Sequence, residues 1–96
     1  MKRLAPFLTA FALSALLAGP AAAACFADYK AKQDAPLRLH YGVIELRGPC
    51  DKAAAAGEIA SRIAGDGWQL LNVVSVFDES GLDERRQSAG QYYLRF

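Results

Sequence analysis

The sequence predicts a small α+β domain in which a three-stranded sheet packs one helix on one face, with a short N-terminal arm before the first strand. Apolar and polar residues alternate from 37 to 46, which is typical of a strand with one buried face. Residues 52–64 are rich in alanine and carry isoleucines at helical spacing. Residues 68–77 are dense in β-branched and aromatic residues, and 91–96 predict a closing strand. The expected order of elements is βαββ.

Length and composition restrict the class of protein. The chain has 96 residues, of which 53% are hydrophobic, with 11 basic against 10 acidic side chains. A nucleic-acid-binding domain would show a basic excess or stripe, so no nucleic-acid partner is expected. A disordered chain would be poor in apolar residues and highly charged. A single folded domain at residues 37–96 is the remaining interpretation.

Residues 1–24 have the three parts of a signal peptide. Lys2 and Arg3 give a positive start, residues 4–17 are mostly apolar, and an alanine run follows Gly19-Pro20. The apolar stretch is shorter than the roughly 20 residues that a membrane-spanning helix needs. We therefore expect cleavage near Ala24 and a periplasmic or secreted mature protein.

The two cysteines of the chain leave alternatives open. Cys25 would stand at the start of the mature chain, and Cys50 is the other thiol. In an oxidising compartment an even pair usually closes a disulfide, which would also stabilise a domain of marginal size. Alternatively, Cys25 is lipidated and the protein is an envelope lipoprotein, the only route by which we expect a membrane partner. Two free thiols are the third alternative, and a lipidated sulfur excludes the disulfide.

Turn and cap signals give the boundaries of the domain. Residues 25–36 form an arm that we expect to be a short helix or turns. Asp51 can cap the helix at 52–64, and Gly65 and Gly67 can end it. Such a helix returns the chain so that the first two strands run parallel, and a last strand placed between them makes every pairing antiparallel.

A charged loop is expected from 78 to 89, and the core is expected to form around aromatic and branched residues. The expected core residues are Trp68, Tyr41, Ile59, Ile63, Leu70, Val74, Tyr92 and Leu94.

The run from Ile63 to Val74, with Gly67-Trp68 at its centre, resembles the bacterial family called domain of unknown function 4177. The strand at 41–46 and the terminal Tyr92-Tyr93-Leu94 fit the same pattern, so the resemblance covers about residues 39–96. Gln69 stands where the family usually has Glu. The resemblance implies the βαββ fold and no activity, since the family has no established one.

Few residues point to chemistry. His40 is the single histidine and has no sequence-evident nucleophile or second metal ligand beside it. The acids at 78–84 lack the spacing of an EF-hand loop. Arg85 and Arg86 are candidate interaction residues, together with His40. We expect no cofactor, no metal and no catalytic residue.

The expected function is that of a non-catalytic accessory or binding module. A three-stranded sheet has two edges, which invite strand addition from a protein partner or from a second copy. The lipoprotein anchored at Cys25 and a small enzyme using His40 are the alternatives.

Intact mass under non-reducing conditions tests export and the fate of both sulfurs. We expect a chain that begins at or next to Cys25 and lacks two hydrogen atoms relative to the reduced form. A lipid adds several alkyl chains to the mass instead. A product that retains Met1 contradicts the predicted export.

Overall fold

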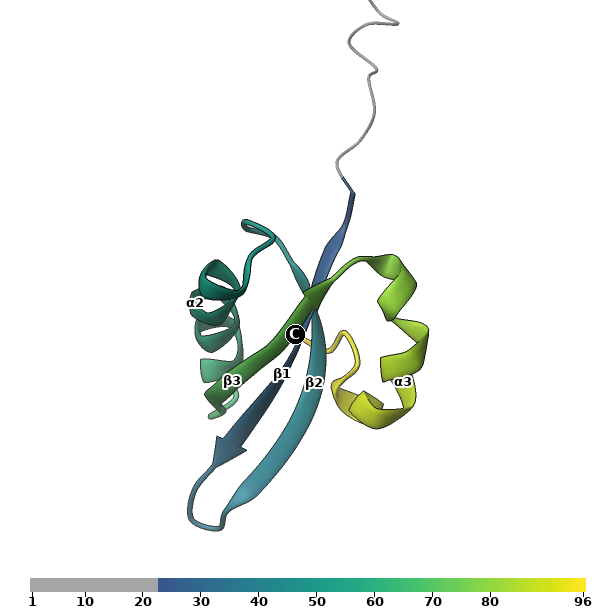
Figure 1. Cartoon of the computed structure of the whole chain (residues 1–96). Coiled ribbons are helices and arrows are strands. Elements are labelled where there is room, and N and C mark those ends of the chain that lie inside the picture. The colour runs from purple at the N-terminus through teal and green to yellow at the C-terminus, as the bar shows by residue number, and fades with distance from the viewer. Residues whose placement is uncertain (1–22) are drawn as a thin grey trace, which may run out of the picture.

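The computed structural model describes residues 23–96, so that nearly all of the predicted signal peptide lies outside the described residues. A sheet carries one helix on each side (Figure 1). The elements in chain order are β1 Cys25–Gln33, β2 Arg38–Leu46, α2 Lys52–Ala64, β3 Gln69–Phe77, the 3-10 turn η1 Glu79–Gly81, α3 Asp83–Ala89 and the 3-10 turn η2 Gly90–Tyr92.

The three strands form one antiparallel sheet in the order β2-β1-β3. β1 and β2 are joined as a hairpin, and α2 carries the chain from β2 across one face to β3, which runs parallel to β2 on the far side of β1. The predicted class, a small α+β domain with a three-stranded sheet and one main helix on it, is confirmed, with α3 as a short additional helix.

The prediction of a helical or turn-rich arm at 25–36 is wrong, because this segment forms β1, the central strand. Alanine, lysine and aspartate have low intrinsic preference for strands, so propensity gave little indication of it. The segment is buried on both faces along most of its length, with Phe26 and Asp28 5% and 4% exposed. Ala27, Tyr29 and Ala31 are at most 1% exposed on one face, and Lys30 is exposed on the other. Pairing on both sides outweighs the weak propensity.

The predicted strand at 91–96 is also wrong. The segment begins as η2 and then makes one isolated bridge between Tyr93 and Val43. The main-chain N–H of Leu94 donates to the Val43 carbonyl at 2.8 Å, which covers part of the outer edge of β2. The central place expected for a closing strand is held by β1 instead.

The segment predicted as a charged loop contains regular structure. Asp78 accepts a hydrogen bond from the Ser80 N–H at 2.9 Å and thereby begins η1. α3 follows directly, with Asp83 and Glu84 in its first turn, where acidic groups interact favourably with the helix dipole.

The helix predicted at 52–64 is confirmed, with both of its ends formed as expected. Asp51 caps α2 by accepting the Ala54 N–H at 2.8 Å. After Gly65, Gly67 adopts φ of +82°, a conformation that suits glycine, and its N–H donates to the Ala64 carbonyl at 2.9 Å. The chain then turns directly into β3.

The main core lies between α2 and the sheet. Ile59 and Ile63 are fully buried there, and Trp68 is 7% exposed, as expected. Tyr41, Leu70 and Tyr92 are only partly buried. The buried members of the cluster are Cys25, Ala27, Tyr29, Ala31, Ile44, Leu46, Ala55, Ile59, Ile63, Trp68 and Val73.

Two expected core residues are on the surface. Val74 is 38% exposed and Leu94 is 42% exposed. The register between β1 and β3 shifts twice, and each shift leaves one β3 residue, Val74 or Leu71, without a partner on β1. Such bulges break the alternation that predicted Val74 as buried. Leu94 is exposed because its segment is not a strand.

The predicted disulfide is present between Cys25 and Cys50, with a Cα–Cα distance of 5.9 Å. It joins the start of β1 to the turn that precedes α2. Closing a loop of this sequence separation, 25 residues, stabilises a domain by about 3 kcal/mol in the chain-entropy model. The bond therefore fixes the central strand at its first residue.

Gly42 leaves room for the ring of Tyr29, since a Cβ there would lie 2.5 Å from two of its atoms. We expect Gly42→Ala to lower the free energy of unfolding by about 2 kcal/mol through overpacking. Gly57→Ala is the control, because apart from the adjoining backbone of α2 no atom lies within 4 Å of its Cβ position, and it should stabilise by up to about 1 kcal/mol. Urea unfolding measures both, and equal effects would contradict the packing.

Candidate functional site

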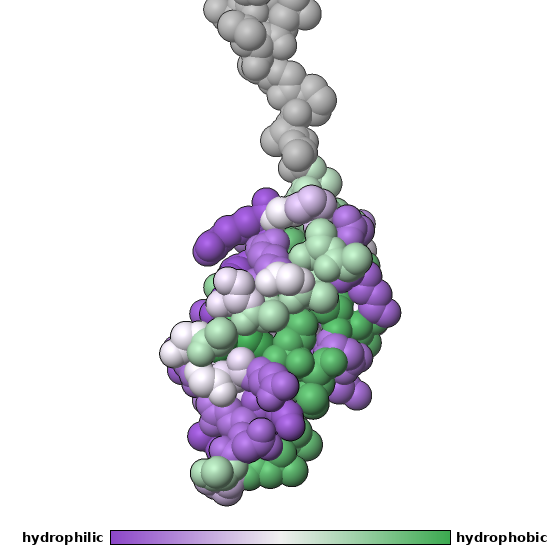
Figure 2. All heavy atoms as spheres, turned by 90° about the vertical axis from the view of Figure 1, so that its left-hand side faces the viewer, coloured by the Kyte–Doolittle hydropathy of each residue, from purple (hydrophilic) through white to green (hydrophobic). Residues whose placement is uncertain are grey.

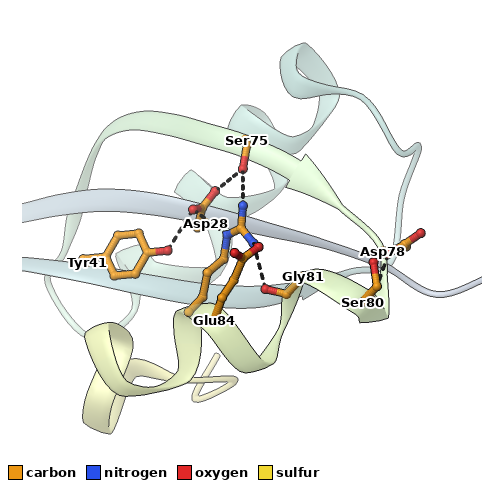
Figure 3. A network of polar contacts seen from close by, with 8 residues as sticks. Asp28, Tyr41, Ser75, Asp78, Ser80, Gly81 and Glu84 are labelled. Carbon is orange, nitrogen blue, oxygen red and sulfur yellow. Dashed lines mark hydrogen bonds and ion pairs between the residues drawn. The ribbon is translucent and has the colours of Figure 1, made fainter.

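The face of the sheet opposite α2 carries a buried polar network around Asp28, which is 4% exposed. Ser75 donates its hydroxyl to Asp28 Oδ1 at 2.6 Å, and Tyr41 donates its hydroxyl to Oδ2 at 2.8 Å. Arg85 Nε donates to Oδ2 at 3.0 Å. Figure 3 shows the side chains of Ser75 and Tyr41 directed at Asp28 from two different strands.

The sheet register and α3 bring these residues together. Asp28 on β1 lies opposite Ser75 on β3, and α3 supplies Arg85 from above the sheet. The guanidinium of Arg85 also lies 4.0 Å from the Phe77 ring and donates to the Gly81 carbonyl at 2.7 Å. Any side chain at Gly81 would collide with Phe77 and Arg85, so this approach requires glycine.

Hydrogen bonding keeps Asp28 ionised. Burial raises the pKa of its carboxyl group, but the hydrogen bonds from Ser75, Tyr41 and Arg85, with the positive charge of Arg85, outweigh burial and hold the pKa below its ordinary value. The raised pKa of Tyr41, about 12, has burial as its main cause and the bond to Asp28 as the second. A carboxylate held in this way is a weak base, and the network ties α3 to the sheet.

His40 lies on the other face, in an aromatic cluster. Its Nε2 is 3.0 Å from the Tyr29 hydroxyl oxygen. Its ring stacks on Tyr92 at a centroid distance of 3.8 Å and meets the edge of Trp68 at 4.2 Å. The Nδ1 atom is buried and has no hydrogen-bond partner in the described part of the chain.

Burial makes His40 a poor candidate for catalysis. Burial, followed by the charge of Arg95, lowers its pKa to about 4, so the ring is neutral at neutral pH. The side chain is 8% exposed, whereas a general base must reach the proton that it removes. Its hydrogen-bond partner among residues 23–96 is a tyrosine and not a carboxylate.

The two arginines singled out from the sequence have different surroundings. Arg85 is engaged with Asp28, as described, and with Glu84 at 2.7 Å. Arg86 has 64% of its side chain exposed, although it lies 3.7 Å from Asp83 and packs against the ring of Tyr93. Arg86 alone of the two is accessible to another molecule.

Hydrophobic residues on the surface were missed by sequence reasoning. Figure 2, which views the molecule from the α2 side, shows hydrophobic residues gathered next to hydrophilic ones on that side. β3 lies at the end of the sheet and pairs with β1 along one side, so its other side is a free edge of the sheet. β3 carries no charged residue. The exposed large hydrophobic residues are Leu37, Leu39, Leu71, Val74 and Leu94.

Within residues 23–96, no three His, Cys, Asp or Glu side chains are grouped closely enough to hold a metal ion. No helix in this part of the chain has the length and apolar character required to cross a bilayer. The chain matches no protein-family model, and no match was found among curated proteins or solved structures. The resemblance to the domain of unknown function 4177 family stays a prediction.

Removing the charge of Asp28 should be costly, because it leaves Arg85 without its partner under α3. We expect Asp28→Asn to lower the free energy of unfolding by about 3 kcal/mol. Asp34→Asn is the matched control, since it breaks an exposed pair with Lys32 worth at most about 1 kcal/mol. Urea unfolding at neutral pH measures both variants.

The pH dependence of the free energy of unfolding also tests whether Asp28 is held ionised by its hydrogen bonds. The folded protein binds the Asp28 proton more weakly than the unfolded chain does, so the stabilisation is present above the ordinary aspartate pKa and is lost as the pH falls through the folded-state value. Asp28→Asn should therefore flatten the acid limb of the stability curve. An equally steep limb contradicts the network.

His40 should titrate far below an ordinary histidine. We expect the ring resonances, followed by NMR, to move with a midpoint near pH 4. Because the unfolded chain takes up this proton more readily, the neutral ring stabilises the fold above pH 6.5 and that contribution is lost as the pH falls towards 4. A midpoint near 6.5 would place His40 in solvent.

Proposed function

We propose that the protein is an exported, non-catalytic accessory module that binds a partner protein or a second copy through the free edge of its sheet. The observation that carries the proposal is that β3 is an uncharged edge strand with exposed hydrophobic side chains. Its nine residues hold no charge, and Leu71 and Val74 are 49% and 38% exposed. An uncharged edge strand presents unpaired N–H and C=O groups that another strand can satisfy.

The opposite edge supports the choice of β3. On β2, the Val43 carbonyl already accepts the Leu94 N–H, and Tyr93 bridges to the same residue. Natural proteins usually cover or charge an edge that must stay unpaired. In the described residues β2 has such a cover over part of its edge, whereas β3 has neither a cover nor a charge and is irregular only where its pairing with β1 shifts.

The burial of Asp28 and His40 favours a binding function over a catalytic one. Both side chains are held by hydrogen bonds and packing inside the domain, and neither offers a reactive atom to solvent. An enzyme using His40 would need that side chain exposed to substrate. The lipoprotein alternative would need the Cys25 sulfur that the disulfide uses.

Export is proposed from the signal-peptide pattern of residues 1–24. The disulfide supports it, because such bonds persist in oxidising compartments and are rare in the cytosol.

Adding a charge to the free edge tests the proposal. Val74→Lys should abolish association, since it places an ammonium group on the strand that must pair. Ala60→Lys adds the same charge on the exposed face of α2 and should leave association unchanged. Light scattering after size exclusion reports self-association, and a pull-down from periplasmic extract reports a partner. A monomer that retains no partner, or a Val74→Lys variant that associates normally, contradicts the proposal.

A further inference from the structure

The face of the sheet that carries Asp28 is only half covered. α3 covers the part next to Asp28. The hairpin of β1 and β2 extends beyond both helices (Figure 1). The uncovered half therefore consists of the hairpin end of β1 and β2 and the beginning of β3.

This uncovered half carries a shallow groove that is widely open to solvent. The groove has a volume of about 340 Å³ and is lined by Lys30, Leu39, Tyr41 and Leu71, and also by Ala31 and His40, whose side chains pack on the opposite face of the sheet. Leu39 and Leu71, on the two outer strands, are 66% and 49% exposed. Apolar side chains from both outer strands thus line a groove with β1 between them.

The covered half indicates what kind of element fits this face. There, a short helix packs on the sheet and brings a basic side chain, Arg85, to the acid on β1, Asp28. Along the same face of β1 the next residues are Lys30, opposite Tyr41, and Lys32, opposite Leu39. The covered half of this face therefore has an acidic residue of β1, and the uncovered half has basic residues of β1.

The charge on Lys30 is not neutralised within the domain. Lys32 lies 3.4 Å from Asp34 at the hairpin turn. Lys30 is exposed, and no acidic group among residues 23–96 forms an ion pair with it. An occupant of the groove that supplies a carboxylate would therefore pair with Lys30 while its apolar atoms contact Leu39 and Leu71.

We propose that this groove binds an amphipathic segment of a partner protein that places acidic side chains beside apolar ones. The inference rests on the proposed role as a binding module and specifies the chemistry of the partner, but it uses the groove and not the β3 edge. A hollow bounded by leucines receives side chains that protrude from a segment. An anionic membrane is the other occupant that lysines and leucines suit, and binding to vesicles distinguishes it from a protein segment.

Selection of displayed random peptides on the purified, disulfide-bonded protein tests the proposal even while the natural partner is unidentified. We expect the enriched peptides to combine Asp or Glu with Leu, Ile or Phe. Lys30→Glu should weaken binding of these peptides by about tenfold or more. A new selection on Lys30→Glu should enrich Lys or Arg in place of the acids. Lys52→Glu, a charge reversal at the exposed start of α2, is the control and should bind as the parent does.

Failure of the peptide selection would overturn the proposal, either as enrichment without acidic residues or as no enrichment at all. Where no peptide binds, binding to vesicles containing phosphatidylglycerol, lost in Lys30→Glu and absent with phosphatidylcholine, would assign the groove to an anionic membrane instead. Val74→Lys separates this inference from the edge proposal, because the selected peptides should bind that variant normally even where association through β3 is lost. Peptides that bind Lys30→Glu unchanged but fail on Val74→Lys would assign them to the edge.

Discussion

The pairing of β1 with both other strands is the constraint on which the rest of the structure depends. β2 and β3 contact the sheet only through it, so each face of the domain is organised around its residues. On one face Tyr29 fills the space above Gly42 and meets His40. On the other, Asp28 receives Arg85 from α3. The disulfide at Cys25 holds the first residue of the same strand.

In this arrangement the buried groups hold the domain together, so the features that bear on function lie on its surface. The buried carboxylate of Asp28 is paired with Arg85, which connects α3 to the sheet, and the Leu94 N–H connects the segment after α3 to β2. Two surface features without a partner among residues 23–96 bear on function: the uncharged edge of β3, and the groove in which Lys30 lies between Leu39 and Leu71. Both features suit the recognition of a protein segment, and the two surfaces meet at Leu71.

The sequence predicts the parts of the fold that local patterns encode. The helix at 52–64, its cap at Asp51 and the strand that becomes β2 are confirmed because spacing and cap chemistry are local signals. β1 was missed, since its alanines and lysines acquire strand structure only through pairing on both sides. The Asp28 network could not be predicted, because Arg85 is 57 residues from Asp28 in the sequence. The exposure of Val74 could not be predicted either, because the bulge depends on the register between β1 and β3.

Hydrogen exchange of the β1 amides, measured by NMR on the oxidised protein, tests the central position of this strand most directly. A strand hydrogen-bonded on both sides opens only with global unfolding. We therefore predict that the amides of residues 26–32 include the slowest to exchange and report the full free energy of unfolding. Fast exchange there, with slow exchange at 91–96, would mean that residues 25–36 form a peripheral arm, and it would contradict the central position of β1.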